Sequence, residues 1–346
     1  MYLLSIVIPT FNRCKSLRKI LDQMTNQISP ERNSQIELVL SDNASSDETK
    51  KIVSEWRRKN KKINFSYFCN KTNLGFDRNC LSGANRASGK FVWFMSDDDS
   101  LSDGAVDKVF NALMSHRDVV FAFVNYSMIT PGFDEYFPCK FKGDIKVSFD
   151  DLIIKTKFYF SFISSCIFNR EILCSIDLNK YLGTDWMQLY AVKIIAPMGE
   201  SLIISEPLIK MIRPGLQESR KEKKSDTMAI DFFMRAHLSF LNYLNTFNES
   251  NYSKKTLKFI KNLGWNDNLN QIISLKLTSD SYNFNQIKLV FLGMARHFSH
   301  KISFWCIHLP MLILPKFVSV IYFYIKLRYI YLKKIIKQLL INLKLL

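Results

Sequence analysis

Three consecutive aspartates, Asp97, Asp98 and Asp99, are the residues of this sequence best suited to chemistry, and they closely follow the apolar run at residues 91–95. Aromatic residues and valine are typical of a buried strand, and unpaired acids cannot enter a core, so we expect the acids where that strand emerges. Carboxylate oxygens there suit Mg²⁺ or Mn²⁺ carrying a phosphorylated ligand. The alternative is an acidic turn in which Asp99 or Ser100 caps the next helix.

Two other apolar runs also end in polar residues. Residues 5–10 and 36–41 are almost continuously apolar, which indicates strands buried on both faces of a parallel sheet. The first run ends at Thr10, and Asp42 directly follows the second. Open α/β sheets bind ligands at the carboxyl ends of their strands, so these tips are candidate ligand contacts.

Apolar residues at helical spacing separate the predicted strands. A helix is expected from Leu17, and a capping box of Ser45 and Glu48 is expected to start another. The alternation continues with a strand at residues 63–68, helices at 81–87 and 106–113, and a strand at 119–124. This order over about the first 125 residues predicts an α/β fold with a doubly wound, mixed but mostly parallel sheet flanked by helices.

Two common phosphate-binding motifs are absent from the sequence. No G-x-G-x-x-G follows the first predicted strand, and no G-x-x-x-x-G-K-[ST] occurs. Dinucleotide-binding and P-loop proteins are therefore disfavoured as classes. A diphosphate bound at this edge would need a metal ion to neutralise it, which the three aspartates could hold.

The composition concentrates positive charge near the C-terminal end. The net charge of the 346 residues is +17, and ten Lys or Arg residues but no acid follow Asp280. Such a segment favours an anionic partner, either a membrane surface or a nucleic acid. No recognisable nucleic-acid-binding fold accompanies it, so we expect no nucleic acid partner.

The cysteines and the first residues indicate a reducing compartment. Seven cysteines without C-x-x-C spacing fit free thiols better than disulfides or a zinc site. Residues 1–8 are too short an apolar run for a signal peptide and are interpreted as part of the first strand. We therefore expect a cytoplasmic protein.

The tail is apolar and basic without a clear membrane span. Residues 302–325 contain Pro310, Pro315 and Lys316, which argue against a spanning helix. Residues 326–346 combine six basic residues with Leu, Ile and Tyr. They predict an amphipathic helix on a membrane surface, and a packed helical appendage is the alternative.

Four fragments at the predicted tips resemble the motifs of family 2 glycosyltransferases of GT-A fold. They are residues 9–13, 42–47, 73–79 and 96–99, and they occur in the family's order and at its intervals. The run Gly-Thr-Asp-Trp within residues 181–189 is most similar to the abequosyltransferase-type branch, which transfers deoxysugars. The resemblance covers about residues 3–215 and leaves out the tail.

The resemblance implies a role for each matching residue. Asp98 is the expected metal ligand for Mn²⁺ or Mg²⁺, with Asp99 as a neighbour or alternative ligand, and Asp185 is the expected general base, although Asp185 could instead be only a helix N-cap. Arg78 and Arg213 could contact the diphosphate or be ordinary surface charges. The expected contacts of the nucleotide-sugar donor are Thr10, Asn12, Arg13, Asp42, Asn73, Arg78, Asp97 and Arg213.

The resemblance also implies a domain organisation. A catalytic GT-A domain is expected at residues 1–219, with a nucleotide-sugar half at about 1–125 and an acceptor half at about 126–219. A helical extension at 220–300 and a membrane-associating basic tail at 301–346 are expected to follow.

The implied function is metal-dependent, inverting transfer of a sugar, possibly a deoxyhexose, from a nucleotide-diphosphate sugar. The acceptor would be a saccharide, lipid-linked, in surface polysaccharide, O-antigen or capsule synthesis at the inner face of the plasma membrane. Two alternatives stay open: a sugar nucleotidyltransferase, which usually needs a loop rich in Gly and Lys after the first strand, and a non-catalytic membrane scaffold with a degenerate site.

Overall fold

The computed structural model describes residues 2–129 and 134–212 and, further along, residues 239–240, 242–244, 246–247 and 252–262. The chain divides into two compact units, Met1–Lys221 and Glu222–Leu346. In the second unit the structure defines helix α10, Lys254–Asn262. Most of the predicted extension at 220–300 and all of the predicted tail at 301–346 lie outside the described residues.

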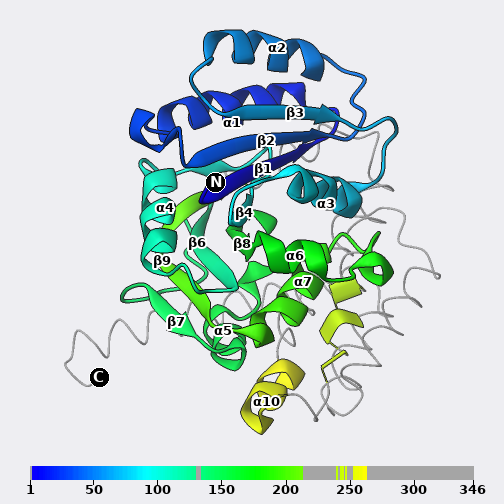
Figure 1. Ribbon diagram of the computed structural model, residues 1–346. Coiled ribbons are helices and arrows are strands. Elements are labelled where there is room, and N and C mark those ends of the chain that lie inside the picture. Colours follow the sequence, from blue (N-terminus) through cyan, green and yellow to red (C-terminus); the bar gives the residue numbers. More distant parts are fainter. Residues whose placement is uncertain are drawn as a thin grey trace. The chain divides into compact units, whose positions relative to one another are not determined.

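The first unit alternates strands and helices (Figure 1). Its strands are β1 (Leu4–Thr10), β2 (Ile36–Asp42), β3 (Phe65–Cys69), β4 (Phe91–Phe94), β5 (Ser100–Leu101), β6 (Phe121–Ile129), β7 (Ile145–Val147), β8 (Cys166–Asn169) and β9 (Ser201–Ile212). Its α-helices are α1 (Cys14–Gln27), α2 (Thr49–Lys59), α3 (Phe76–Arg86), α4 (Ala105–Ser115), α5 (Phe149–Thr156), α6 (Arg170–Ser175) and α7 (Met187–Ile195). Short 3-10 helices are η1 (Pro30–Arg32), η2 (Tyr159–Ser161), η3 (Ile163–Ser165), η4 (Asn179–Tyr181) and η5 (Ala196–Met198).

All the strands of this unit form one mixed sheet. Their order is β3-β2-β1-β4-β8-β6-β9-β5, and β7 pairs with β9. The pairs β3–β2, β2–β1, β1–β4 and β6–β9 are parallel, whereas β8, β5 and β7 run antiparallel to their neighbours. The predicted α/β fold with a mixed sheet is confirmed, and its first four strands in spatial order are all parallel.

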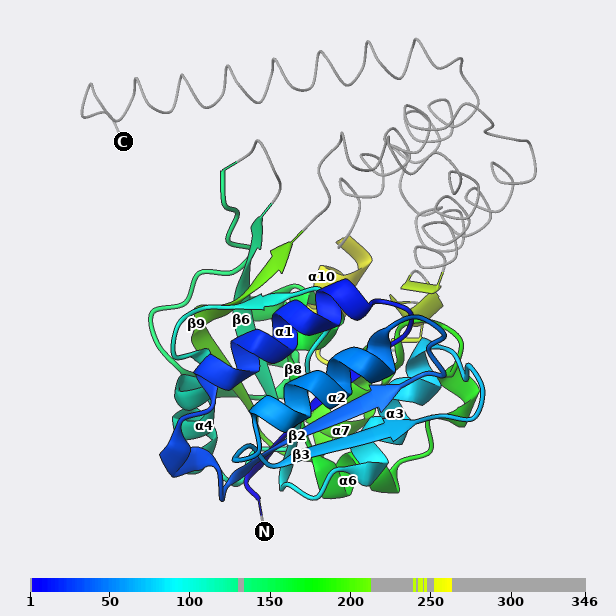
Figure 2. The ribbon, with the colours of Figure 1, turned by 90° about the horizontal axis from the view of Figure 1, so that it is seen from above.

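Helices cover the parallel strands on both sides. Helix α1 packs against α2 and α4, while α3 packs against β1, β2 and α6. Figure 2 shows α1 and α2 side by side across β2 and β3. This cover explains why β1, β2 and β4 are buried along their whole lengths and why their sequences are nearly continuous apolar runs.

The predicted capping box of Ser45 and Glu48 is wrong. Helix α2 begins at Thr49, where the carboxylate of Asp47 accepts the backbone N–H (3.0 Å) and the hydroxyl (2.6 Å) of Thr49. Ser45 instead accepts the backbone N–H of Asn12 from the loop after β1 (2.9 Å). The local pattern failed because a neighbouring loop uses the serine.

No helix among the described residues is long and apolar enough to cross a membrane.

A buried acid holds together the amino-terminal ends of β1, β2 and β4. Glu37 accepts hydrogen bonds from the hydroxyls of Ser5 and Ser88 and from the backbone N–H of Gly89. Gly89 also donates its N–H to the Ser5 hydroxyl (2.8 Å). A Cβ atom at Gly89 would lie 2.5 Å from the Ser5 Oγ and 2.9 Å from the Leu4 carbonyl carbon, so only glycine fits.

We predict that Gly89→Ala destabilises the first unit by about 1–3 kcal/mol, because backbone atoms of β1 must move to admit the methyl group. Urea unfolding of the variant and the parent measures the difference. Gly143→Ala is the matched control, since the space beside Gly143 is open. Equal stability of Gly89→Ala and the parent would contradict the close approach.

Candidate active site

The carboxyl ends of β1, β2 and β4 bring the predicted donor contacts to one edge of the sheet. Thr10 ends β1, pairs with Asp42 at the end of β2, and donates its hydroxyl hydrogen to Asp97 Oδ2 (2.6 Å) beyond β4. Burial raises the pKa of Asp97, while the Thr10 hydroxyl and the Arg13 guanidinium oppose that rise. Three predicted site residues from separate parts of the sequence are therefore in direct contact or register.

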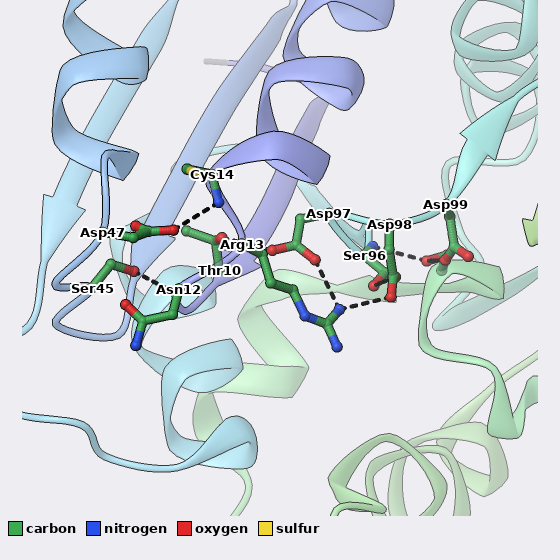
Figure 3. Close-up of polar contacts among 11 residues, drawn as sticks. Thr10, Asn12, Arg13, Cys14, Ser45, Asp47, Ser96, Asp97, Asp98 and Asp99 are labelled. Carbon is green, nitrogen blue, oxygen red and sulfur yellow. Dashed lines mark hydrogen bonds and ion pairs between the residues drawn. The ribbon is translucent and has the colours of Figure 1, made fainter. Parts of the chain in front are cut away.

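Arg13 connects two members of the acid cluster (Figure 3). Its guanidinium Nη1 lies 3.1 Å from Asp97 Oδ1 and 2.7 Å from Asp98 Oδ2. The side chains of Arg13 and Asp98 are 53% and 50% exposed, whereas that of Asp97 is 3% exposed. The cluster thus combines a buried carboxylate, that of Asp97, with a solvent-exposed carboxylate, that of Asp98.

Asp99 lies in a different environment from Asp98. Its residue is only 8% exposed, and its Oδ2 accepts the hydroxyl hydrogen of Ser164 in η3 (2.6 Å). The same Ser164 hydroxyl accepts the backbone N–H of Ser96 (2.9 Å). Burial raises the pKa of Asp99 to about 8, so its carboxyl group is mostly protonated at neutral pH.

Asp42 is almost completely buried beneath the loop that follows β2. It is 1% exposed, and its carboxylate accepts the backbone N–H of Ser45 (2.9 Å) and the hydroxyl of Tyr67 (2.8 Å). Burial and the hydrogen bond to Asp42 raise the pKa of Tyr67, which keeps the phenol protonated. Solvent therefore barely reaches Asp42 in this structure.

Asn12 and Asn73 stabilise the loops around this edge. The side-chain oxygen of Asn12 accepts the backbone N–H of Ser46 (2.8 Å), and Asn12 has a positive φ of 52°. Asn73 accepts a hydrogen bond from the side chain of Asn43 (2.7 Å), which also accepts the backbone N–H of Leu74 (2.8 Å). These contacts connect the loop after β2 with the segment that leads into α3.

Asp185 lies in a turn just before α7. The alternative that Asp185 is the N-cap of this helix is wrong by one residue, because α7 starts at Met187 and its N-cap residue is Trp186. Asp185 has a φ of +61°. Non-glycine residues in that region are uncommon and cluster at functional sites.

Contacts through two elements tie Asp185 to the donor edge. Asp77 on α3 accepts the backbone N–H groups of residues 183–185, and α3 itself follows the loop held by Asn43. On the other side, Gln188 of α7 donates to the carbonyl of Ser161 (2.6 Å), three residues before the Ser164 that holds Asp99. The turn with Asp185 is thus anchored to both halves of the site.

Two predicted residues, Arg78 and Arg213, have no contact described above, and two residues of the site were not predicted. Arg78 is exposed on α3, and Arg213 lies outside the described residues. Sequence reasoning missed Asp77 and Ser164. An acid in the first turn of a helix, such as Asp77, normally signals only a favourable helix dipole interaction. Ser164 carries no sequence signal, since it lies in a mixed polar and apolar segment.

The acid cluster offers a cation one exposed carboxylate, that of Asp98. The Arg13 guanidinium already occupies a cationic position between two carboxylates. Among the described residues no group of three or more His, Cys, Asp or Glu side chains is placed to hold a metal ion. Mg²⁺ is commonly bound by one or two carboxylates together with substrate phosphates, and Asp98 with a nucleotide would give such a set.

Comparison with protein families and curated proteins agrees with this geometry. Residues 5–174 match the family described as Glycosyl transferase family 2. The chain is 28% identical over 270 residues to abequosyltransferase RfbV of Salmonella typhimurium, a match that covers 73% of this chain and 78% of RfbV. A shorter match, 38% identical over 104 residues, covers 30% of this chain and 32% of the GalNAc(5)-diNAcBac-PP-undecaprenol beta-1,3-glucosyltransferase of Campylobacter jejuni.

Solved structures share the fold. The segment 1-349 of TarS from S. aureus, in complex with UDP, aligns with a TM-score of 0.53 and 16% identity, over 88% of this chain and 75% of that segment. The mannosyltransferase PcManGT from Pyrobaculum calidifontis, in complex with GDP-Man and Mn²⁺, aligns with a TM-score of 0.51 and 15% identity, over 90% of this chain and 84% of PcManGT. Residues 5–174 therefore form a glycosyl transferase family 2 domain, and the protein is a glycosyltransferase of GT-A fold.

Proposed function

We propose that this glycosyltransferase moves a sugar from a nucleotide-diphosphate sugar to a saccharide acceptor, with inversion at the anomeric carbon, in the synthesis of a bacterial surface polysaccharide. The observation that carries the proposal is the open carboxylate of Asp98 above the buried pair of Thr10 and Asp97, at an edge to which the turn with Asp185 is anchored. Asp98 can serve the leaving diphosphate, and Asp185 can serve the incoming hydroxyl.

The donor half binds the nucleotide and neutralises its charge. Asp98 would hold a divalent cation, Mn²⁺ or Mg²⁺, which supplies charge neutralisation to the departing diphosphate. Asp97, fixed by Thr10, would accept hydrogen bonds from the ribose. An ion pair as exposed as Arg13–Asp98 is worth about 0–1 kcal/mol, so the guanidinium can leave Asp98 and turn toward a phosphate at little cost.

The acceptor half supplies a base. Asp185 would take the proton from the acceptor hydroxyl as that oxygen attacks the anomeric carbon. A single base opposite the leaving group leads to one in-line displacement and therefore to inversion. Arg78, exposed on α3, and Arg213 stay candidate contacts of the diphosphate. Candidate contacts elsewhere on the donor are Asn12, Arg13 and Asn73. Asp42 stays a candidate contact of the nucleobase.

The names of the relatives support the proposed substrates. RfbV is named as an abequosyltransferase, which supports a deoxyhexose donor. The Campylobacter relative is named for an acceptor linked to undecaprenol through a diphosphate, which supports a lipid-linked saccharide acceptor. TarS structures contain UDP or UDP-GlcNAc, so a nucleotide-diphosphate sugar suits the fold. A lipid-linked acceptor would place the enzyme peripherally on the cytoplasmic face of the plasma membrane, with the basic tail against anionic lipid.

Asp99 is a weaker candidate ligand than Asp98. A protonated carboxyl group does not coordinate a cation, and burial keeps Asp99 mostly protonated up to a pH of about 8. We therefore assign the first contact of the cation to Asp98 and keep Asp99 as a second ligand that must first lose its proton.

We predict that Asp98→Asn and Asp185→Asn separate binding from chemistry. In a panel of nucleotide sugars with Mn²⁺, Asp98→Asn should weaken metal-dependent donor binding by about tenfold or more, because one carboxylate ligand is lost. Asp185→Asn should keep donor binding and slow transfer and donor hydrolysis by about 10²-fold to 10⁴-fold, because the base is lost. Isothermal titration and product release measure the two effects.

The control for this pair is Asp103→Asn, which removes an exposed carboxylate near the cluster. It should bind and turn over the donor like the parent. If Asp98→Asn and Asp185→Asn also transfer sugar at the parental rate, the assignment of the site is wrong.

We predict that ionisation of Asp99 destabilises the fold when no cation is bound. Because folding raises its pKa from 3.8 to about 8, its stabilising contribution is complete below the ordinary pKa and is lost as the pH rises through about 8. Asp99→Asn can still accept the Ser164 hydrogen bond and removes this loss. Between about pH 5 and about pH 9, the variant should gain about 4 kcal/mol in unfolding free energy relative to the parent.

Urea unfolding in the presence of a chelator measures this difference. A difference that stays constant over this pH range would show that Asp99 does not change its protonation there.

A further inference from the structure

One carboxylate collects the backbone amides around Asp185. Asp77 lies in the first turn of α3 and is 2% exposed. Its Oδ2 accepts the N–H groups of Gly183 (2.8 Å), Thr184 (3.0 Å) and Asp185 (3.1 Å), and its Oδ1 accepts that of Met187 (3.4 Å). Four amides of one short segment therefore point at a side chain more than a hundred residues earlier in the sequence.

The backbone of this turn has the shape that such convergence requires. Gly183 and Asp185 have positive φ values of 83° and 61°. Successive N–H groups turn to one side when residues in left-handed conformations alternate with others, which creates a concave site for an anion. Asp77 fills that site from within the protein, and it compensates an unfavourable conformation at Asp185.

We propose that Asp77 is a positioning residue for Asp185: it fixes the turn so that the Asp185 side chain projects toward the acceptor hydroxyl. The inference rests on the proposed role of Asp185 as the general base. It assigns to the segment that leads into α3 a task on the acceptor side of the reaction, in addition to its contacts with the loop after β2.

An ordinary helix cap does not account for this arrangement. Ser148 caps α5 and Asn169 caps α6, and each accepts a single N–H from its own helix. Asp77 comes from a different helix, and three of its four amide partners precede the first residue of α7. Only the amide of Met187, at 3.4 Å, belongs to α7. The stronger contacts thus serve the turn and not the helix.

The placement of Asp77 also connects the two halves of the site. The loop before α3 is held by the Asn43 side chain, which donates to Asn73 and accepts from Leu74. Asp77 lies two residues after Gly75, where this loop ends. The first turn of α3 therefore connects this loop with the turn of Asp185.

The experiment compares Asp77→Asn with the parent in Mn²⁺-dependent hydrolysis of the nucleotide sugar that the parent hydrolyses fastest in a panel. Asparagine keeps the volume of the side chain but replaces one accepting oxygen with an NH₂ group that faces backbone N–H groups. We expect kcat to fall by about tenfold to a hundredfold, as for a misplaced catalytic group. The Kd of that nucleotide sugar should stay within about twofold of the parental value.

A double variant distinguishes positioning from general structural damage. If Asp77 acts only through Asp185, then Asp77→Asn combined with Asp185→Asn should be no slower than Asp185→Asn alone. A purely structural role would slow the residual reaction further, and this result would overturn the proposal.

A second variant tests the turn without touching Asp77. A methyl group at Gly183 meets no atom within 4 Å, so Gly183→Ala disturbs only the positive φ of the backbone. Gly104→Ala is the matched control, because Gly104 also has a positive φ (68°) and open space beside it. We expect Gly183→Ala to lower kcat without changing the donor Kd, and Gly104→Ala to leave both unchanged.

The outcomes separate the two hypotheses. If Asp185→Asn keeps full turnover, the proposed base is wrong and the role of Asp77 falls with it. If Asp185→Asn loses turnover but Asp77→Asn and Gly183→Ala do not, only the positioning role is wrong. If Asp77→Asn fails to fold, Gly183→Ala decides alone: a parental kcat overturns the proposal.

Discussion

Three adjacent aspartates place negative charge at the carboxyl edge of the parallel strands, and the structure of the site depends on how that charge is accommodated. The fold accommodates it by treating each carboxylate differently. Asp97 is buried and accepts a hydrogen bond from the hydroxyl of Thr10. Asp99 is buried, accepts a hydrogen bond from Ser164 and has a raised pKa. Asp98 is exposed and lies beside Arg13. Asp98 is therefore the one of the three acids whose carboxylate is exposed to solvent, where it contacts the Arg13 guanidinium and the Ser96 hydroxyl.

Hydrogen bonds connect the loops and helices that surround the acid cluster. The loop after β2 is joined to the segment before α3 by side-chain amides, and α3 holds the turn before α7 through Asp77. On the far side, α7 is bonded to η2, and η3 holds the acid cluster through Ser164. The acid cluster and the turn with Asp185 are thus joined by hydrogen bonds of buried or half-buried groups, which are costly to break and keep geometry fixed.

Local patterns in the sequence predicted strands β1 to β4 and β6, helices α1 to α4 and the tips where Thr10, Asp42 and Asp97 lie, because burial on both faces leaves continuous apolar runs. They could not predict contacts between distant segments. The inward turn of Asp99 depends on a serine 65 residues away, and the turn of Asp185 depends on Asp77, 108 residues earlier. The capping box at residues 45–48 failed for the same reason, because the loop after β1 uses that serine.

In the proposed reaction a cation on Asp98 and the base Asp185 face each other across the sugar. The most direct test is a crystal structure of the full chain with Mn²⁺ and a nucleotide sugar, in which anomalous scattering locates the manganese. We expect the manganese at about 2.0–2.3 Å from an Asp98 oxygen and from the diphosphate, with the Asp185 carboxylate on the opposite side of the anomeric carbon. A manganese bound away from Asp98, or a sugar that lies far from Asp185, would contradict the account.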